Sequence, residues 1–187
     1  MDHTEPSSGS DPRRDPAGAR PTSSAGSPPP TDGAGTTPFG VVAAVEHARP
    51  ARKGELLALT RALELRALSA PPAFVTATLQ DVRYLTRRTR EVYTQLAAAG
   101  ARATLLGAGL TSWIAPGVTG VALEESDPLV DEWVLVLPVA GAPTVFAATD
   151  LDISYEDDMD RTFCYAVSYD PEVVDECARL LVVAERR

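Results

Sequence analysis

Hydrophobic residues in the first half of the chain alternate between helical and strand-like spacing. Leucine and alanine recur every three or four positions over residues 55–68, which predicts a helix. Residues 73–79 are rich in β-formers and predict a strand, residues 82–99 a second helix, and residues 103–106 a second strand. Strand, helix and strand in this order predict a right-handed βαβ crossover with parallel strands.

The second half of the chain consists of short apolar segments separated by turn residues, followed by a last helix that begins at Asp170-Pro171. Such segments are typical of antiparallel strands joined by short loops. We therefore predict an α/β (α+β) fold with a mixed sheet of about six strands, one βαβ crossover, an antiparallel meander and helices packed on the sheet. The remaining predicted strands are residues 118–123, 133–139, 144–149 and 162–167.

One stretch organises this half of the chain. Asp127-Pro128 is a helix-start signal, because Asp can cap the first turn and Pro suits its first position. The apolar run 134–139 follows within a few residues, so the helix can have only one turn. We expect this turn to place Glu132 and Trp133 at the start of an interior strand.

Composition divides the chain into three parts. Residues 1–40 are rich in Pro, Ser, Thr and Gly and contain few large apolar residues, which predicts a disordered tail. Residues 41–53 are expected to be a connector, and residues 54–187 a single domain. Within residues 39–45, an apolar patch is consistent with either a strand or a helical turn.

Net charge and hydropathy limit the class of partner. The formal net charge is −9, and most of the acidic excess lies in the domain, which disfavours nucleic-acid binding. No segment is apolar for long enough to span a membrane, and the tail does not resemble a signal peptide, so we expect a soluble cytoplasmic protein. The basic group Arg83, Arg87, Arg88 and Arg90 is interpreted as the solvated face of a helix, with an anionic contact as the alternative.

Residues that support catalysis or bind transition metals are scarce. The cysteines, Cys164 and Cys177, do not form a C-x-x-C pair and are expected to be small core residues. The histidines, His3 and His47, lie in the tail and just after it. We therefore expect no catalytic residues, no metal site and no cofactor, and hence not an enzyme.

Two segments resemble ligand loops only in part. Gly107-Ala108-Gly109 follows a predicted strand, but no helix N-terminus follows to hold a phosphate group. Residues 150–160 are acidic but lack the alternating ligand spacing of a calcium loop. We interpret both segments as loops.

Several short motifs occur in the same order as in a known family. They are Leu59-x-x-x-Leu63-Glu64, Tyr93-x-x-Leu96-Ala97, Asp127-Pro128-Leu129, Glu132-Trp133, Thr149-Asp150-Leu151, Arg161-x-Phe163 and Tyr169-Asp170-Pro171-x-x-Val174. With them, the chain from Gly54 to about Val183 resembles a DICT domain, a sensory module found with diguanylate cyclases and two-component systems. One difference is Leu79-Gln80, where the family has Phe-Gln.

The resemblance implies a signal-input role with no catalytic residues. No cyclase, kinase or DNA-binding domain is recognised beside it, so a signalling partner is expected to be encoded separately. A ligand site is predicted from polar residues at strand ends and a neighbouring aromatic wall. The candidates are Gln80, Tyr84, Tyr93, Glu132, Trp133, Arg161 and Phe163. Alternatively, Trp133 and Phe163 are core residues, and Glu132 with Arg161 is an ion pair that fastens the short helix to the last strand.

Three hypotheses follow. The leading one is a stand-alone sensory or regulatory domain that binds a small molecule and transmits a change of shape to a partner. The second is a ligand-free interaction module, or a homodimer, that uses the strongly apolar helix 55–68 through Leu57, Leu65 and Leu68. The third is an enzyme with Glu132 and Asp150 as acid and base, which the lack of a usable histidine disfavours.

Overall fold

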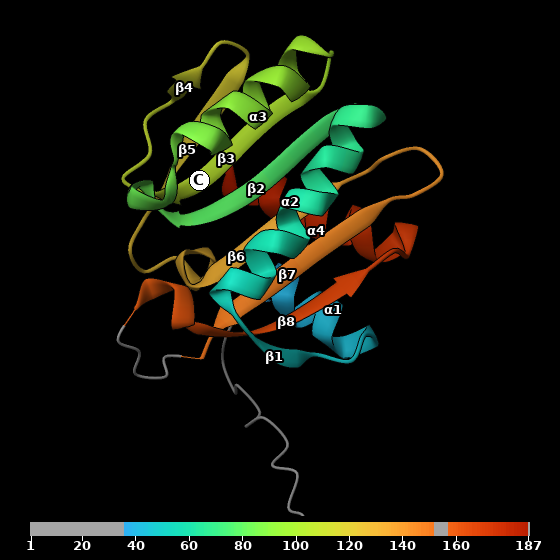
Figure 1. The fold of residues 1–187 in the computed structure, drawn as a ribbon, viewed down its shortest axis with the longest axis vertical. Helices are drawn as coiled ribbons and strands as arrows, with labels where there is room; N and C mark the ends of the chain where they lie inside the picture. Colours follow the sequence, from blue (N-terminus) through green and yellow to red (C-terminus); the bar gives the residue numbers. More distant parts are fainter. Residues whose placement is uncertain (1–35, 152–156, 187) are drawn as a thin grey trace, which may run out of the picture. The chain divides into compact units, whose positions relative to one another are not determined.

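Eight strands form one mixed sheet in the computed structural model, which describes residues 36–151 and 157–186. Their order in the sheet is β1-β8-β7-β6-β2-β3-β5-β4 (Figure 1). The strands are β1 (Arg49–Arg52), β2 (Phe74–Asp81), β3 (Arg102–Ala108), β4 (Trp113–Ala115), β5 (Val118–Leu123), β6 (Glu132–Leu137), β7 (Thr144–Asp150) and β8 (Thr162–Ser168). The helices are α1 (Pro38–Val45), α2 (Lys53–Ser69), α3 (Arg87–Ala98) and α4 (Pro171–Ala184), with 3₁₀ turns η1 (Val82–Tyr84), η2 (Pro128–Asp131) and η3 (Asp158–Asp160).

The strand directions confirm the predicted α/β class. Strands β2 and β3 are parallel and are connected through α3, so the predicted βαβ crossover is present. Strand β5 adds a second parallel pair beside β3. On the other side, β2 meets β6 antiparallel, and β6, β7 and β8 form the predicted antiparallel meander.

The sheet contains two strands that the sequence did not predict, β1 and β4. Both lie at the edges, where short strands pair through their backbones without needing an apolar face. Strand β1 reads Arg-Pro-Ala-Arg, and its Pro50 is tolerated because an edge strand does not need every N–H for the ladder. Strand β4 has only three residues. Neither segment shows the alternation from which strands are predicted.

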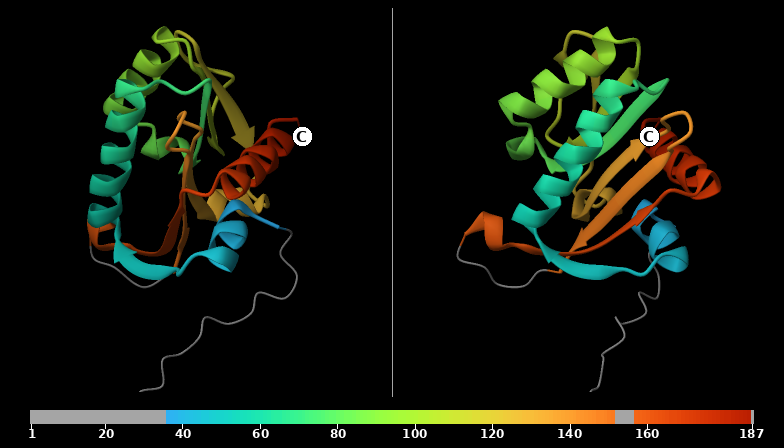
Figure 2. Two further views of the ribbon diagram at one scale, coloured as in Figure 1. Left: turned by 90° about the vertical axis from the view of Figure 1, so that its right-hand side faces the viewer. Right: turned by 45° about the vertical axis from the view of Figure 1, so that its right-hand side comes forward.

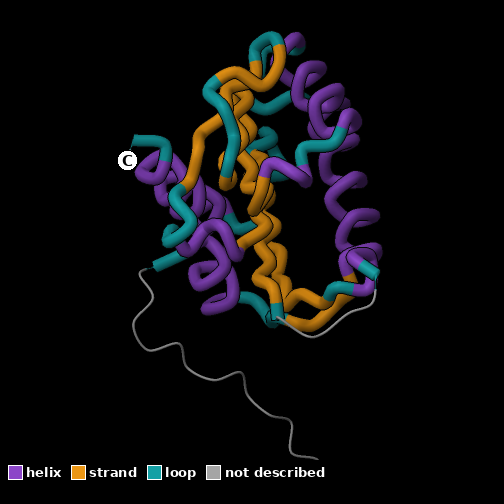
Figure 3. Tube along the Cα trace, turned by 90° about the vertical axis from the view of Figure 1, so that its left-hand side faces the viewer, coloured by secondary structure: helices purple, strands orange, loops and turns teal. Residues whose placement is uncertain are grey.

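Helices cover both faces of the sheet. Helices α2 and α3 lie on one face, and α1 and α4 lie on the other (Figures 2 and 3). Alternate residues of β6 therefore enter two cores: Leu135 packs on the α2/α3 side, and Val134 and Val136 pack on the α1/α4 side. Cys177 is fully buried in the second core as expected, whereas Cys164 is only partly buried.

Helix α3 starts later than predicted. The predicted start at residue 82 is wrong, because residues 82–84 form the separate turn η1. The Asp81 carboxylate accepts a hydrogen bond from the Arg83 N–H at 2.7 Å and caps this turn. The Thr86 hydroxyl then accepts from the Thr89 N–H at 3.1 Å and caps α3. Because these two caps follow each other closely, the segment that apolar spacing predicts as one helix is divided into η1 and α3.

The N-terminal segment is more ordered than a connector. Residues 39–45, for which strand and helix were both open, belong to α1, and the Thr37 hydroxyl caps it by accepting from Gly40 N–H at 3.2 Å. The expected connector 41–53 therefore contains the end of α1 and all of β1. The predicted disordered tail 1–40 is wrong at its end, because residues 38–40 belong to α1. Residues 1–35 of that tail and residues 152–156 of the acidic loop lie outside the described residues. No helix in the described ranges has the length and apolar character to cross a membrane.

The predicted one-turn helix before β6 is present as η2. The Asp127 carboxylate accepts from the Leu129 N–H at 3.0 Å, with Pro128 at the first position. Strand β6 begins at the next residue, Glu132, and lies between β7 and β2 in the interior of the sheet. Trp133 thereby occupies the second position of an interior strand.

Candidate functional site

A cavity of about 630 Å³ lies between the sheet and the layer formed by α2, η1 and α3. Cavities of this size typically hold a small organic molecule. Residues of α2 line one side, residues of η1 and α3 another, and β2 and β6 provide the floor. Its apolar lining includes Leu57, Ala77, Leu79, Trp133, Leu135 and Met159.

The indole of Trp133 is fixed in the cavity floor by two other rings. Phe146 lies 5.4 Å from it and Phe163 lies 6.0 Å from it, both edge-on with an angle of 72° between planes. Such T-shaped contacts are the favoured geometry of aromatic pairs. Trp133 therefore both packs against the core and presents part of its surface to the cavity.

Gln80 enters the cavity because strand β2 is irregular at its end. The register between β2 and β3 shifts between Thr78 and Asp81. At Gln80 φ is 62°, the one positive value among the described residues other than glycine. In a regular strand, consecutive side chains point to opposite faces, yet Leu79 and Gln80 both line the cavity. The bulge thus turns a side chain that would otherwise face α1 and α4 towards α2 and α3.

The side-chain amide group of Gln80 is a buried donor that is not satisfied by the described residues. The residue is only 8 % exposed, and its Nε2 atom is buried without a hydrogen-bond partner among the residues that the structure describes. Burying an amide N–H group without a partner costs about 1–3 kcal/mol, so such groups are rare in folded proteins. A left-handed backbone for a residue other than glycine is also unfavourable. Two unfavourable features at one residue that lines a cavity indicate a binding site.

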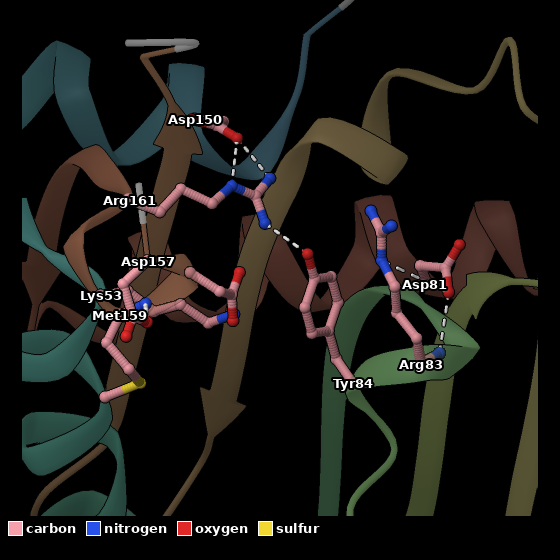
Figure 4. A network of polar contacts seen from close by, with 9 residues as sticks. Lys53, Asp81, Arg83, Tyr84, Asp150, Asp157, Met159 and Arg161 are labelled. Atoms are coloured by element: carbon pink, nitrogen blue, oxygen red, sulfur yellow. Dashed lines mark hydrogen bonds and ion pairs between the residues drawn. The ribbon is translucent and has the colours of Figure 1, made fainter. Parts of the chain in front are cut away.

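Tyr84 connects the cavity to the start of β8. Its hydroxyl accepts a hydrogen bond from Arg161 at 2.7 Å, and Arg161 also forms an ion pair with Asp150 (Figure 4). Lys53, the first residue of α2, lies 4.1 Å from the Tyr84 ring centroid and forms an ion pair with Asp158 of η3. Figure 4 shows the Tyr84 hydroxyl pointing towards the Arg161 guanidinium. These contacts join η1, α2 and the segment before β8.

A second polar contact joins α2 to α3 beside the cavity. Arg88 donates to the buried carboxylate of Glu64 at 2.6 Å. Burial raises the pKa of Glu64, and the hydrogen bond and charge of Arg88 oppose that rise. Tyr93 is buried next to them, and burial together with the Glu64 charge raises the pKa of its phenol well above the usual value. The phenol therefore stays protonated and neutral at physiological pH.

The structure brings six of the seven predicted site residues together. Gln80, Tyr84, Tyr93 and Trp133 line the cavity. Arg161 contacts Tyr84, and Phe163 packs behind Trp133. Of the two residues for which a core role was the alternative, Phe163 is fully buried in the core on this face, and Trp133 is partly buried and packs against that core.

Glu132 does not share this site. It lies on the opposite face of β6, where its carboxylate accepts from the Phe39 N–H at 3.0 Å at the start of α1. Burial raises the pKa of Glu132 to about 7, partly offset by hydrogen bonds from Thr37 and Phe39. The expected ion pair between Glu132 and Arg161 is therefore not formed, and Arg161 pairs with Asp150. Strand alternation explains the separation, since residues 132 and 133 must face opposite ways.

None of the charged residues that line the cavity was among the predicted site residues, although Arg83 and Arg88 belong to the basic group for which an anionic contact was the alternative. The charged lining residues come mainly from α2 and α3 and are Lys53, Arg61, Glu64, Arg83, Arg88 and Asp158. One signal was present in the sequence: the apolar surface of residues 55–68 is wider than one packed face needs. Leu57 uses part of that surface to line the cavity.

A second hollow, of about 550 Å³, lies at the carboxyl ends of the parallel strands. It is bordered by Gly109 of the incomplete glycine motif, and its charged groups are the carboxylates Asp81, Glu124 and Glu125. These charges disfavour a phosphate group, in agreement with the interpretation of that motif as a loop. Among the described residues, no group of three or more His, Cys, Asp or Glu side chains is placed to hold a metal ion.

Comparison with known proteins identifies the family. Residues 42–148 match the family model described as the sensory domain in diguanylate cyclases and two-component systems (DICT). This chain belongs to the DICT family. The matched range contains α2, β2, η1, α3 and β6, and thus most of the DICT cavity, including Gln80 and Trp133. It begins earlier than the resemblance suggested and ends before β8 and α4.

Other comparisons give only distant likenesses to this DICT domain. No match is found among curated proteins. Among solved structures, polyphosphate kinase from Porphyromonas gingivalis is similar at a TM-score of 0.47 and 13% identity, covering 72% of this chain and 22% of that one. TrmBL2, an archaeal chromatin protein, is similar at a TM-score of 0.46 and 14% identity, covering 73% of this chain and 51% of that one. The chain thus spans about a fifth and about half of these two proteins.

Proposed function

We propose that this DICT domain is a sensory input module that binds a small molecule in the cavity under α2 and α3 and passes the resulting change to a separate signalling protein. The observation that carries this proposal is the Gln80 amide, whose nitrogen is buried beside the cavity with no hydrogen-bond partner in residues 36–151 and 157–186. Nε2 lies just beneath the cavity surface, so a ligand removes this penalty by accepting its hydrogen bond once the Gln80 side chain turns towards the cavity.

The contacts of Tyr84 support a route for the change of shape. Tyr84 lines the cavity and also contacts Lys53 and Arg161. A ligand that displaces the Tyr84 ring would alter both contacts at once. Since Lys53 begins α2 and Arg161 precedes β8, the displacement would reach two elements that are far apart in sequence.

The alternative, a ligand-free interaction or dimerisation surface on α2, retains one supporting observation. Leu65 is 60 % exposed, which is unusual for a leucine in the middle of a helix. Leu57, however, lines the cavity, and Leu68 packs against the core. The exposed apolar surface of α2 therefore centres on one side chain, and we favour the sensory proposal.

The two tryptophans allow a matched test by native mass spectrometry of freshly purified protein. Trp133 lines the cavity, whereas Trp113 is 68 % exposed in the edge strand β4. We expect wild-type protein and Trp113→Ala to carry the same additional mass, and Trp133→Ala to lose it while keeping its circular dichroism spectrum. An identical apo mass for all three proteins, together with a stable dimer that Leu65→Glu dissociates, would instead support the interaction module.

A further inference from the structure

The charged residues around the cavity differ in sign from the rest of the protein. The chain as a whole has a net charge of −9. The cavity lining contains the cations Lys53, Arg61, Arg83 and Arg88, but only two carboxylates, Glu64 and Asp158. A locally positive cavity in an acidic protein favours ligands of negative charge.

The two carboxylates are already neutralised by ion pairs. Glu64 pairs with Arg88, and Asp158 pairs with Lys53. Neither carboxylate therefore presents an uncompensated charge to a ligand. The remaining charge on the lining comes from Arg61 and Arg83.

Both remaining arginines are available to a ligand. Arg61 forms no ion pair with any of the described residues, and Arg83 lies 3.8 Å from Asp81, with side chains 69 % and 39 % exposed respectively. Exposed pairs of this kind contribute little free energy and are easily exchanged. Arg61 and Arg83 are exposed yet line the cavity, so they stand where it opens to solvent.

The inner part of the cavity has a different character. Leu79, Leu135 and the indole of Trp133 form an apolar floor on which a flat ring can pack. Gln80 lines the same cavity, and its Nε2 atom, a hydrogen-bond donor buried just beneath the floor, has no partner among the described residues. A ligand that fits must therefore combine an apolar body with a hydrogen-bond acceptor.

We infer that the cavity binds a small organic anion with a flat apolar body, whose acceptor atom meets Gln80 Nε2 and whose negative group lies between Arg61 and Arg83. The inference rests on the proposed function, because it names the class of ligand for the same cavity. It also distinguishes this ligand from a neutral apolar molecule, for which the exposed arginines would have no role.

Two dyes with nearly the same ring system test this charge preference. 8-Anilinonaphthalene-1-sulfonate is an anion, and N-phenyl-1-naphthylamine is its neutral counterpart without the sulfonate. Binding is followed by the quenching of tryptophan fluorescence in Trp113→Phe protein, in which Trp133 is the remaining tryptophan. We expect saturable one-to-one quenching by the anionic dye, at an affinity at least about tenfold higher than that of the neutral dye.

A pair of double variants in the same Trp113→Phe background identifies the source of the preference. Arg61→Glu with Arg83→Glu should weaken the anionic dye by about tenfold or more and leave the neutral dye unchanged. The control is Arg87→Glu with Arg179→Glu, which changes the net charge equally at two exposed arginines that do not line the cavity. We expect this control to leave both affinities within about twofold, because distant exposed charges are screened by salt.

The outcomes separate this inference from the proposed function. If both dyes quench Trp133 with equal affinity, or if the anionic preference survives Arg61→Glu with Arg83→Glu, the anion inference is overturned while a ligand cavity remains. If neither dye quenches Trp133, the cavity is not a binding site, and the proposed function is overturned as well.

Discussion

At the scale of single residues, the most informative feature is that Gln80 is locally unfavourable in two ways. Its backbone has a positive φ, and its side-chain amide nitrogen is buried with no hydrogen-bond partner in the described part of the chain. Folded proteins keep such residues where the surrounding structure enforces them, and functional sites are frequent among those places. The strain at Gln80 is therefore evidence for the binding site that is independent of the cavity itself.

The backbone strain at Gln80 predicts that a glycine substitution is more stable than an alanine substitution, which is the reverse of the usual order. Because glycine accepts a positive φ without steric cost, Gln80→Gly should be more stable than Gln80→Ala by about 1 kcal/mol. Urea denaturation monitored by circular dichroism measures the difference. Equal stability, or a more stable Gln80→Ala protein, would show that position 80 is not strained.

Glu132 predicts a pH dependence on the other face of the sheet. The pKa is raised from 4.5 in the unfolded chain to about 7 in the folded protein. Between these values the folded state retains a proton that the unfolded state has lost, so the free energy of unfolding falls as pH rises from 4.5 to about 7. The Glu132 carboxyl thus makes the free energy of unfolding about 3 kcal/mol lower above pH 7 than at acidic pH.

Glu132→Gln tests this effect, because the amide keeps an acceptor for the Phe39 N–H but does not ionise. We expect the variant to be more stable than the wild type at pH 8 and nearly equal to it at pH 5, as measured by urea denaturation at both pH values. A difference in stability that is the same at both pH values would contradict the raised pKa.

At the scale of elements, the cavity depends on how α2 and α3 are held together over the sheet. Arg88 of α3 reaches the buried carboxylate of Glu64 in α2, and Lys53 at the start of α2 holds Tyr84 and η3. Periodicity predicted both helices, because each has apolar residues at three-to-four spacing. It could not predict the break at residues 82–86, which depends on the side-chain caps of Asp81 and Thr86.

The contact between α2 and α3 predicts a coupled pair of substitutions. Arg88→Ala leaves Glu64 buried without its partner and should lower the free energy of unfolding by about 2 kcal/mol. Adding Glu64→Gln removes the buried charge, so the double variant should recover part of that loss. Thermal denaturation of the two single variants and the double variant measures the coupling, and strict additivity would mean that the ion pair does not link the helices.

At the scale of the whole molecule, the order of the strands and helices other than α1, β1 and β4 was predictable, but the composition of the site was only partly so. The βαβ unit and the meander follow from local patterns that agree with the final sheet. Strand alternation already implied that Glu132 and Trp133 face opposite sides, so the misplacement of Glu132 could have been avoided. The bulge that turns Gln80 into the cavity, and the pairing of β1 with β8, depend on tertiary contacts that leave no local pattern.

The most direct test of the central claim, that a ligand in the cavity completes the hydrogen bond of Gln80, is a ¹H–¹⁵N correlation spectrum. The Gln80 side-chain amide is assigned by its absence in Gln80→Gly, and spectra are recorded with and without anthraquinone-2-sulfonate, a flat aromatic anion whose ring carbonyls are hydrogen-bond acceptors separate from its sulfonate. We predict that the Gln80 Nε2 and Trp133 Nε1 signals shift in a saturable manner while the signal of exposed Trp113 stays in place. A Gln80 amide that does not respond, or a Trp113 signal that shifts as much as that of Trp133, would contradict the account.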